Sequence, residues 1–443
     1  MDKFGQPGVP AASARPADAG AARHGPLTAN DRAGELATLF GTVAEPDFRP
    51  ARWLANRHAQ TIWPNRIKRH PAGARLAAAA KPAIIESEDG DALRLYWSCH
   101  EGDEAGGAQA PGHGRRAAGE PGAGESGKLG AGVPRVGEPG ELEAGVPRVG
   151  EPGELEAGRE RRPPRPVLVI LHGLTGGADA DNVMAMGAKG HGLGFDVVRV
   201  DLRNSQAEGT PSLGIGHAGR SEDLRATLRH VAERRPGAPT AVVGFSLGGN
   251  IALKAAGEYG ERAPAELRAV AAISVPIDLD HACTAIDSRP ENWIYRTYFL
   301  RRLGRRYLRA RAERPDLFPA VDVDRIRGIR EWDDAVVAPL GGFADAGDYY
   351  ARNSSLRVID RIRVPTLLVH AQDDPFIPFD PFAAPSVRDN PWLHLLAPAH
   401  GGHVGFFAAH GVNGELDRYW AENRALAFCA AACGLLPADG PDR

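Results

Sequence analysis

The sequence predicts an α/β protein with a mostly parallel, doubly wound sheet and a helical cap inserted late in that sheet. Two observations lead to this prediction. Short, almost uninterrupted apolar runs alternate with longer helix-compatible segments along the chain, as expected for strands that are buried on both faces. One of these runs, Thr240 to Phe245, leads into a Gly-x-Ser-x-Gly turn that a helical segment follows at once.

Eight segments have the length and composition of strands. The turn Glu88 to Asp91 joins the first two and is typical of a hairpin. The later strands alternate with helical segments, which predicts parallel pairing. The expected strands are 83–87, 93–98, 167–171, 197–201, 240–245, 269–275, 365–370 and 392–396, and the expected helices are 183–193, 220–233, the segment after the Gly-x-Ser-x-Gly turn and 415–435.

Other segments are expected to lie outside the sheet. Residues 1–45 are rich in Ala, Pro, Gly and charge without periodicity, which predicts a disordered tail. Residues 101–163 form a low-complexity insertion with a perfect 13-residue tandem repeat, which predicts a surface loop; an interaction tail is the alternative. The predicted organisation is a tail at 1–45, an α/β domain at 46–435 that contains the insertion at 101–163 and a helical cap at about 281–353, and a tail at 436–443.

Composition excludes several classes of protein. The formal net charge of -3 provides no basic field for nucleic acid. The four cysteines are too few for a disulfide scaffold and are expected to be reduced. The first residues lack the basic and apolar regions of a secretory signal, and no apolar run has the roughly 18 residues that a membrane span needs. We expect a cytoplasmic protein without nucleic acid or an integral membrane segment, and its oligomeric state and any peripheral membrane contact stay open.

The turn Gly244-Phe-Ser-Leu-Gly248 makes Ser246 a candidate nucleophile. At the apex of such a strand–turn–helix the serine is held in a strained conformation, and the two glycines let the backbones pass closely. The pattern is short enough to occur by chance, so a plain strand-to-helix turn is the alternative. The apolar run before the turn and the apolar segment after it favour the nucleophile.

A serine nucleophile needs a general base, and the base needs an orienting carboxylate. The run 365–370 leads into Asp373 and Asp374, downstream of Ser246. We favour Asp374 as the acid, because Asp-Pro-x-Ile-Pro is the usual form of an acid loop, and we expect Asp373 to serve the loop structure. Two surface loops with unrelated Asp and His residues are the alternative.

The candidate bases His400 and His403 follow the run 392–396. We favour His403, because the two glycines between the histidines let the loop fold back over the site and the apolar residues after it can anchor the loop. A metal site that combines both histidines with Asp374 is the rival interpretation. It would leave the serine without a role.

Acyl transfer also needs backbone N–H donors for the oxyanion. Position along the chain offers Leu247, which follows the nucleophile, and Leu174, which follows the His172-Gly pair at a strand end. We expect His172 to brace that loop rather than to act as a base. His217 is a candidate for the wall of the site, but a loop histidine with satisfied hydrogen bonds is the favoured interpretation.

Several short motifs agree in order and spacing with one known family. They are Trp53 to Ile62 (with His58, Gln60 and Thr61), His172-Gly-Leu174, Gly244-Phe-Ser-Leu-Gly-Gly-Asn250, Asp348 to Ser354, Asp373-Asp-Pro375 and Gly401-Gly-His-Val-Gly-Phe406. In these residues the chain resembles the YheT-type branch of the α/β-hydrolases over about residues 46–430. That branch is similar to the lipid-active abhydrolase esterases of eukaryotes and to the medium-chain ethyl ester synthases of yeast.

The resemblance implies hydrolysis of carboxylic esters by a triad of Ser246, Asp374 and His403, without a cofactor. It further implies small-molecule or lipid-like substrates with short to medium acyl chains. The insertion at 101–163 departs from the family pattern, and so does the loop after Asp201, which weakens any substrate inference there. The expected function is a serine esterase with an acyl-enzyme on Ser246; an acyltransferase or ester synthase, or a catalytically silent binding protein, are the alternatives.

The segment Trp293 to Arg311 predicts a basic amphipathic helix, because apolar residues recur at 295, 299, 303 and 307 with arginines between them. A cap helix with a solvated arginine face is the favoured interpretation. A lid that touches lipid surfaces is the alternative.

Overall fold

The computed structural model describes residues 29–43, 48–64, 67, 69, 72–100, 163–205, 212–409 and 417–436. The expectations for residues 1–28, for the insertion up to residue 162 and for the tail from residue 437 therefore lie outside the described residues. Within the described part of the chain, no helix combines the length and the apolar character needed to cross a membrane.

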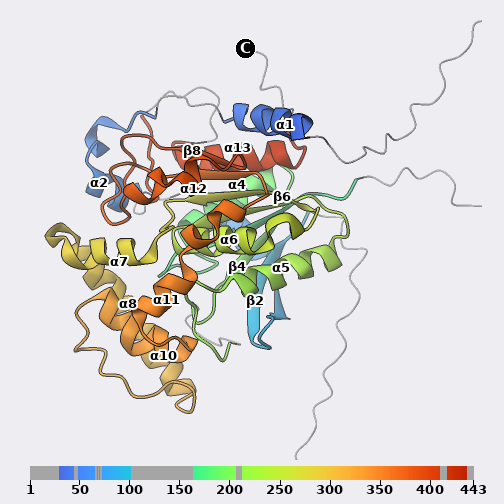
Figure 1. The fold of residues 1–443 in the computed structure, drawn as a ribbon. Coiled ribbons are helices and arrows are strands. Elements are labelled where there is room, and N and C mark those ends of the chain that lie inside the picture. The colour runs from blue at the N-terminus through green and yellow to red at the C-terminus, as the bar shows by residue number, and fades with distance from the viewer. Residues whose placement is uncertain are drawn as a thin grey trace, which may run out of the picture.

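An eight-stranded sheet in the order β1-β2-β4-β3-β5-β6-β7-β8 forms the centre of the molecule (Figure 1). The hairpin β1–β2 and the pair β2–β4 are antiparallel, and every other pair is parallel. The eight predicted strands are confirmed, with ends that shift by a few residues. They are β1 (Lys81–Glu86), β2 (Ala92–Ser98), β3 (Val167–Leu171), β4 (Asp196–Asp201), β5 (Thr240–Phe245), β6 (Leu267–Ile273), β7 (Thr366–Val369) and β8 (Leu393–Leu396).

Helices cover both faces of this sheet, and strand β3 shows why the strands are apolar throughout. Its Val167, Val169 and Leu171 pack into one core, whereas Leu168 and Ile170 point to the opposite face and pack into a second core. The first core includes the helices α5 (Ser221–Arg234) and α6 (Leu247–Tyr259), and the second includes α4 (Asp181–Gly192) and α13 (Trp420–Ala432). The remaining short elements are η1 (Arg52–Leu54), α2 (Arg57–Ile62), α3 (Ala72–Ala79), η3 (Gly260–Arg262), η6 (Ser355–Arg357), η7 (Ile359–Arg361), η8 (Asp380–Ala383) and α12 (Pro385–Arg388).

The prediction of a disordered tail through residue 45 is wrong for residues 29–43. Helix α1 (Ala29–Gly41) lies along α13 at the top of Figure 1. Its Phe40 stacks on Phe428 and on His394, with ring centroids 5.9 Å and 5.0 Å apart, and Val43 beyond the helix is fully buried. Apolar residues at 36, 39 and 40 form one face of the helix, and Val43 continues this spacing beyond its end. The high content of Ala, Gly and Pro around them hid this pattern.

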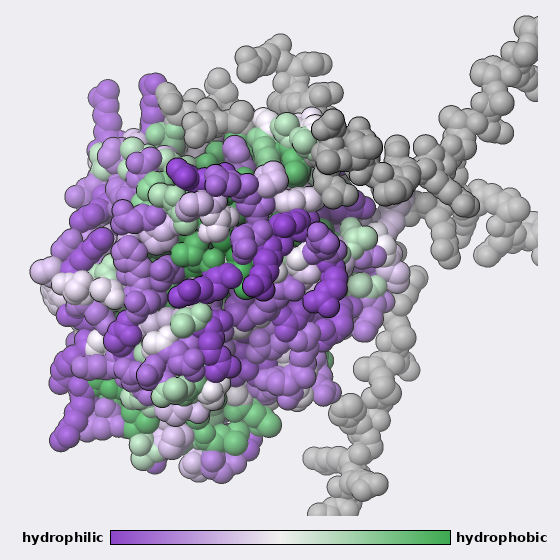
Figure 2. Space-filling model, viewed as in Figure 1, coloured by the Kyte–Doolittle hydropathy of each residue, from purple (hydrophilic) through white to green (hydrophobic). Residues whose placement is uncertain are grey.

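A helical cap separates β6 from β7 and extends from the sheet at the lower left of Figure 1. It has its own hydrophobic core, into which the amphipathic helix α8 directs Tyr295 and Tyr307. In the same view most of the surface is hydrophilic, with hydrophobic residues gathered over part of the cap (Figure 2). The cap elements are α7 (Leu279–Ser288), η4 (Pro290–Asn292), α8 (Trp293–Glu313), α9 (Ile329–Trp332), the π-helical stretch Asp333–Val337, α10 (Ala338–Gly341) and α11 (Ala346–Asn353).

Asn250 ties the cap to the sheet. It is fully buried and is the fourth residue of α6, where its side-chain amide donates to the carbonyls of Ala218 (2.9 Å) and Asn353 (2.8 Å) and accepts from the N–H of Ser355 (2.9 Å). Helix α6 starts after Ser246, so Asn250 lies inside the helix and does not cap it. Through Asn353 and Ser355, Asn250 holds the segment in which the chain returns from the cap to the sheet.

We predict that Asn250→Ala lowers the free energy of unfolding by about 2–4 kcal/mol, because three buried backbone groups lose their partner. Urea denaturation followed by circular dichroism measures this change. The exposed Arg262, just beyond α6, provides the control: Arg262→Ala is expected to stay within about 0.5 kcal/mol of the parent protein. Equal stability of the two variants would contradict the role of Asn250.

Candidate active site

Ser246 lies at the turn between β5 and α6 in a strained backbone conformation. Its φ of 51° and ψ of -117° lie in a region that residues with a side chain rarely occupy. The backbone of Ser246 is held by a donation to the carbonyl of Ile273 (2.9 Å) and by acceptance from the N–H groups of Gly249 (2.9 Å) and Asn250 (3.2 Å). A Cβ atom at Gly244 would collide with the backbone of Gly248, so the glycines of the turn are required sterically.

The structure brings His403 and Asp374 to this serine, and we call the three residues the triad. His403 Nε2 lies 3.1 Å from Ser246 Oγ, and His403 Nδ1 lies 2.8 Å from Asp374 Oδ2. The other carboxylate oxygen of Asp374 accepts from the N–H groups of Phe376 (3.1 Å) and Ile377 (2.9 Å). Burial acts to raise the pKa of Asp374, but the adjacent His403 outweighs it and the pKa is lowered. An ionised Asp374 only accepts hydrogen bonds, so the proton of His403 lies on Nδ1 and Nε2 is free to accept from the serine.

Asp373 and His400 pair with each other beside the triad. His400 Nδ1 lies 3.1 Å from Asp373 Oδ2, and Asp373 Oδ1 accepts from the N–H of Gly402 at 3.0 Å. Of the two aspartates, it is Asp374 that contacts His403, whereas Asp373 holds the loop that carries the histidine. Among the described residues, no group of three His, Cys, Asp or Glu side chains is arranged to hold a metal ion.

The loop that carries His403 depends on residues from the start of the domain. Four of its residues have positive φ angles, Gly401, Gly402, Val404 and Phe406. Thr61 Oγ1 accepts from the N–H of His403 (2.9 Å), and the fully buried amide of Gln60 both accepts from the N–H of Phe407 (2.8 Å) and donates to its carbonyl (3.1 Å). The sequence placed this segment within the predicted α/β domain, but did not indicate that it holds the histidine loop. The family motif that contains Gln60 and Thr61 was the available signal.

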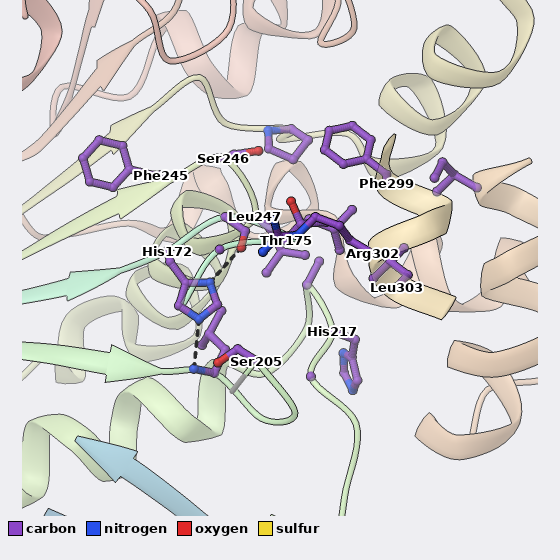
Figure 3. Close-up of a pocket in the computed structure, with 18 of the residues that line it drawn as sticks. His172, Thr175, Ser205, His217, Phe245, Ser246, Leu247, Phe299, Arg302 and Leu303 are labelled. Atoms are coloured by element: carbon purple, nitrogen blue, oxygen red, sulfur yellow. Dashed lines mark hydrogen bonds between the residues drawn. The ribbon is translucent and has the colours of Figure 1, made fainter. Parts of the chain in front are cut away.

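A second loop, between β3 and α4, passes the nucleophile. His172 Nδ1 lies 2.7 Å from the carbonyl oxygen of Gly173, and His172 Nε2 lies 3.1 Å from the backbone nitrogen of Leu202 (Figure 3). The backbone N–H of Leu202 donates, so His172 Nε2 is the acceptor. The ring proton therefore lies on Nδ1, which donates a hydrogen bond to the carbonyl of Gly173. Burial lowers the pKa of His172 to about 4, so the ring is neutral at physiological pH. The histidine braces the loop, in agreement with the sequence prediction.

The candidate oxyanion donors Leu174 and Leu247 both line the same cavity as the triad serine and histidine. Leu247 is the first residue of α6, where backbone N–H groups have no acceptor within the helix. Gly173 approaches the nucleophile so closely that an added Cβ atom would lie 3.3 Å from Ser246 Cβ. Leu174 and Leu247 thus lie at the cavity beside Ser246, and their role as oxyanion donors stays a prediction.

The cavity has a volume of about 900 Å³ and extends from the triad into the cap. Most of its cap side is apolar, and a smaller group of polar residues interrupts that lining. His217 is among them: it packs edge-on against Phe343 and Tyr349, and its Nδ1 accepts from the N–H of Gly219 at 3.0 Å. Both interpretations of His217 therefore hold in part, because it lines the cavity and has a satisfied ring nitrogen. The apolar lining includes Leu279, Ala282, Ile286, Phe299, Leu303, Tyr307, Phe318 and Trp332.

The loop after Asp201, which departs from the family pattern, is anchored by Arg203. Its guanidinium is almost fully buried and pairs with Asp89, Asp91 and Asp223. These carboxylates raise the pKa of Arg203 although burial alone would lower it. Arg203 therefore joins the β1–β2 turn to α5 and serves the fold.

Comparisons with known proteins agree with this architecture. A family model described as the alpha/beta hydrolase fold matches residues 166–409. YheT of Escherichia coli is 32% identical over 262 residues, which cover 59% of this chain and 75% of that protein. A monoacylglycerol lipase of Saccharomyces cerevisiae is 32% identical over 255 residues, or 55% of each chain. Phospholipase ABHD3 of Mus musculus is 30% identical over 245 residues, or 55% of this chain and 58% of the phospholipase. The matched region thus spans little more than half the length of the lipase and the phospholipase.

We predict that Gln60→Ala loosens the histidine loop, because the buried N–H of Phe407 loses its partner and the C=O of Phe407 keeps only the N–H of Ala51. The free energy of unfolding should fall by about 1–3 kcal/mol, and backbone amides of residues 403–408 should exchange with solvent at least about tenfold faster. Hydrogen exchange followed by mass spectrometry measures this change. Gln372→Ala is the control, because that amide makes one exposed bond, to the carbonyl of Ala397. Unchanged exchange at 403–408 would contradict the support role of Gln60.

Proposed function

Because the chain belongs to the α/β hydrolase fold family, in its YheT-like branch, we propose that it is a serine hydrolase that cleaves carboxylic esters. One observation carries the proposal: the hydrogen-bonded triad of Ser246, His403 and Asp374 faces a largely apolar cavity. The named activities of the lipase and phospholipase relatives, both of which cleave esters, support the same reaction class.

In the first half of the proposed reaction, Ser246 Oγ attacks the ester carbonyl carbon while His403 Nε2 takes the hydroxyl proton. Asp374 stabilises the imidazolium that forms and keeps its orientation. The N–H groups of Leu174 and Leu247 stabilise the negative oxygen of the tetrahedral intermediate. The intermediate collapses when His403 returns the proton to the departing alkoxide, which leaves as an alcohol, and an acyl-enzyme remains.

In the second half, a water molecule attacks the acyl-enzyme and His403 takes one of its protons. The same backbone donors stabilise the second oxyanion. Its collapse releases the carboxylic acid and returns the proton to Ser246. Water is the acceptor in a hydrolase, and an alcohol in its place would yield a new ester from the same acyl-enzyme.

The cavity supports an acyl chain as the part of the substrate that is buried in the cap. Its apolar lining suits a hydrocarbon, for which burial stabilises binding by about 0.8 kcal/mol per methylene. We therefore propose short- to medium-chain acyl esters or lipid-like esters as the substrate class. Figure 3 shows Phe299 and Leu303 of α8 on the cap side of this space, opposite Ser246.

We predict that Ser246→Ala lowers kcat for a p-nitrophenyl ester by at least about 10⁴-fold, and that Asp374→Asn lowers it by about 10³–10⁴-fold, because the wrong histidine tautomer becomes favoured. A fluorophosphonate probe should label the parent protein and not Ser246→Ala. Asp373→Asn is the matched control and should cost less than about tenfold, because the asparagine oxygen can still accept from Gly402. If Ser246→Ala retains the activity of the parent protein, the proposed function is wrong.

We predict that Ala282→Phe shortens the acyl chains that the enzyme prefers. Ala282 is buried on α7 and lines the cavity, so a phenyl ring there displaces roughly two methylenes of chain, and kcat/KM for a decanoate ester should fall at least about tenfold relative to an acetate ester. Thr284→Phe, on an exposed position of the same helix, should leave the ratio unchanged. An unchanged ratio in Ala282→Phe would place the acyl chain elsewhere.

A further inference from the structure

One arginine of the cap binds the loop that carries Leu174. Arg306, on α8, donates from Nη1 to the carbonyl of Leu174 (3.3 Å) and from Nη2 to the carbonyls of Thr175 (2.9 Å) and Gly176 (2.6 Å). Three successive carbonyl oxygens therefore converge on one guanidinium, whose planar array of N–H groups can hold several acceptors at once. In Figure 3, Arg302 and Leu303 of the same helix face Thr175 across the cavity.

These contacts restrict the backbone of Leu174 from both sides. The peptide group before it contains the carbonyl of Gly173, which is bound by His172 (2.7 Å) and by the N–H of Gly176 (3.0 Å). In a trans peptide the C=O and the following N–H point in opposite directions, so these bonds direct the N–H of Leu174 away from His172. In the part of the chain that the structure describes, the carbonyl of the peptide group after Leu174 accepts its hydrogen bond from Arg306. The direction of the Leu174 N–H thus depends on two anchors, one on the sheet and one on the cap.

The positive charge of Arg306 argues against a purely structural role for this side chain. Burial lowers its pKa to about 10, with a further contribution from Arg302, while Asp201 acts in the opposite direction. The side chain is therefore still protonated at neutral pH. Among the described residues its hydrogen bonds go to carbonyl oxygens and none to a carboxylate. A cation that is half-buried without an ion pair costs stability, so an apolar residue would seat α8 on the domain at lower cost.

We propose that Arg306 is a positioning residue that makes the oxyanion site depend on the seating of the cap. With α8 packed over the loop, Arg306 holds the peptide after Leu174 and so aligns the Leu174 N–H with the negative oxygen of the tetrahedral intermediate. When α8 moves away, this donor loses one of its two anchors. The inference rests on the proposed function, because it concerns the same reaction at Ser246.

Steady-state kinetics with a p-nitrophenyl ester test the inference. In Arg306→Gln, kcat should fall by about 10–100-fold while KM stays within about twofold, because the oxyanion is stabilised mainly in the transition state. Arg306→Lys keeps the charge but has one ammonium group in place of the planar guanidinium. Its loss of kcat should therefore lie between those of the parent protein and Arg306→Gln. The exposed neighbour Arg305 does not line the cavity, and Arg305→Gln should match the parent protein.

A boronic acid that forms a tetrahedral adduct with Ser246 separates positioning from packing. Its affinity for Arg306→Gln should weaken by the same factor as kcat/KM, whereas the affinity for the carboxylic acid product should not change. An unchanged kcat with unchanged boronate affinity overturns the inference, and so does a loss confined to KM. If Arg306→Gln does not fold, the same two measurements on Arg306→Lys decide. Loss of activity in Ser246→Ala together with a fully active Arg306→Gln would refute this inference and leave the proposed function intact.

Discussion

The arrangement of the site depends on one buried carboxylate that accepts hydrogen bonds from three directions. Two backbone N–H groups and His403 converge on Asp374, which is almost fully buried. An ionised group in such a place is stable only because it is paired and fully bonded. That requirement fixes the proton of His403 on Nδ1, and this in turn leaves Nε2 to accept from Ser246. The protonation state of the site thus follows from the geometry of the loop after β7.

Much of the fold and the triad could be predicted from the sequence because their signals are local. The eight strands were visible as apolar runs, and the turn at Ser246 was visible as a glycine pattern between a strand and a helix. The structure also brings together the three side chains that position and loop chemistry favoured, Ser246, Asp374 and His403. The form of the loop favoured Asp374 over Asp373, and the structure shows how the two differ: Asp374 contacts His403, whereas Asp373 contacts His400 and the N–H of Gly402.

The features that the sequence did not predict involve contacts between distant segments. Gln60 meets Phe407 across 347 positions, and Arg306 meets Leu174 across 132, so no local pattern reports either pair. Asn250 lies close to the Gly-x-Ser-x-Gly turn in the sequence, but its hydrogen-bond partners lie where the chain returns from the helical cap and in the loop that contains Ala218. Helix α1 is different, because its apolar face is a local pattern. The Ala, Gly and Pro residues around that face are typical of a disordered tail and hid the pattern.

The dependence of the histidine loop on Thr61 and Gln60 has a consequence for biosynthesis. These residues are translated well before their partners, since Thr61 precedes His403 by 342 positions and Gln60 precedes Phe407 by 347. Since domains assemble from the N-terminus during translation, Ser246 and its turn can form while the chain still lacks His403. At that stage the Ser246 hydroxyl has no imidazole beside it, and the proposed reaction becomes possible only after residues 60–61 and 403–407 meet.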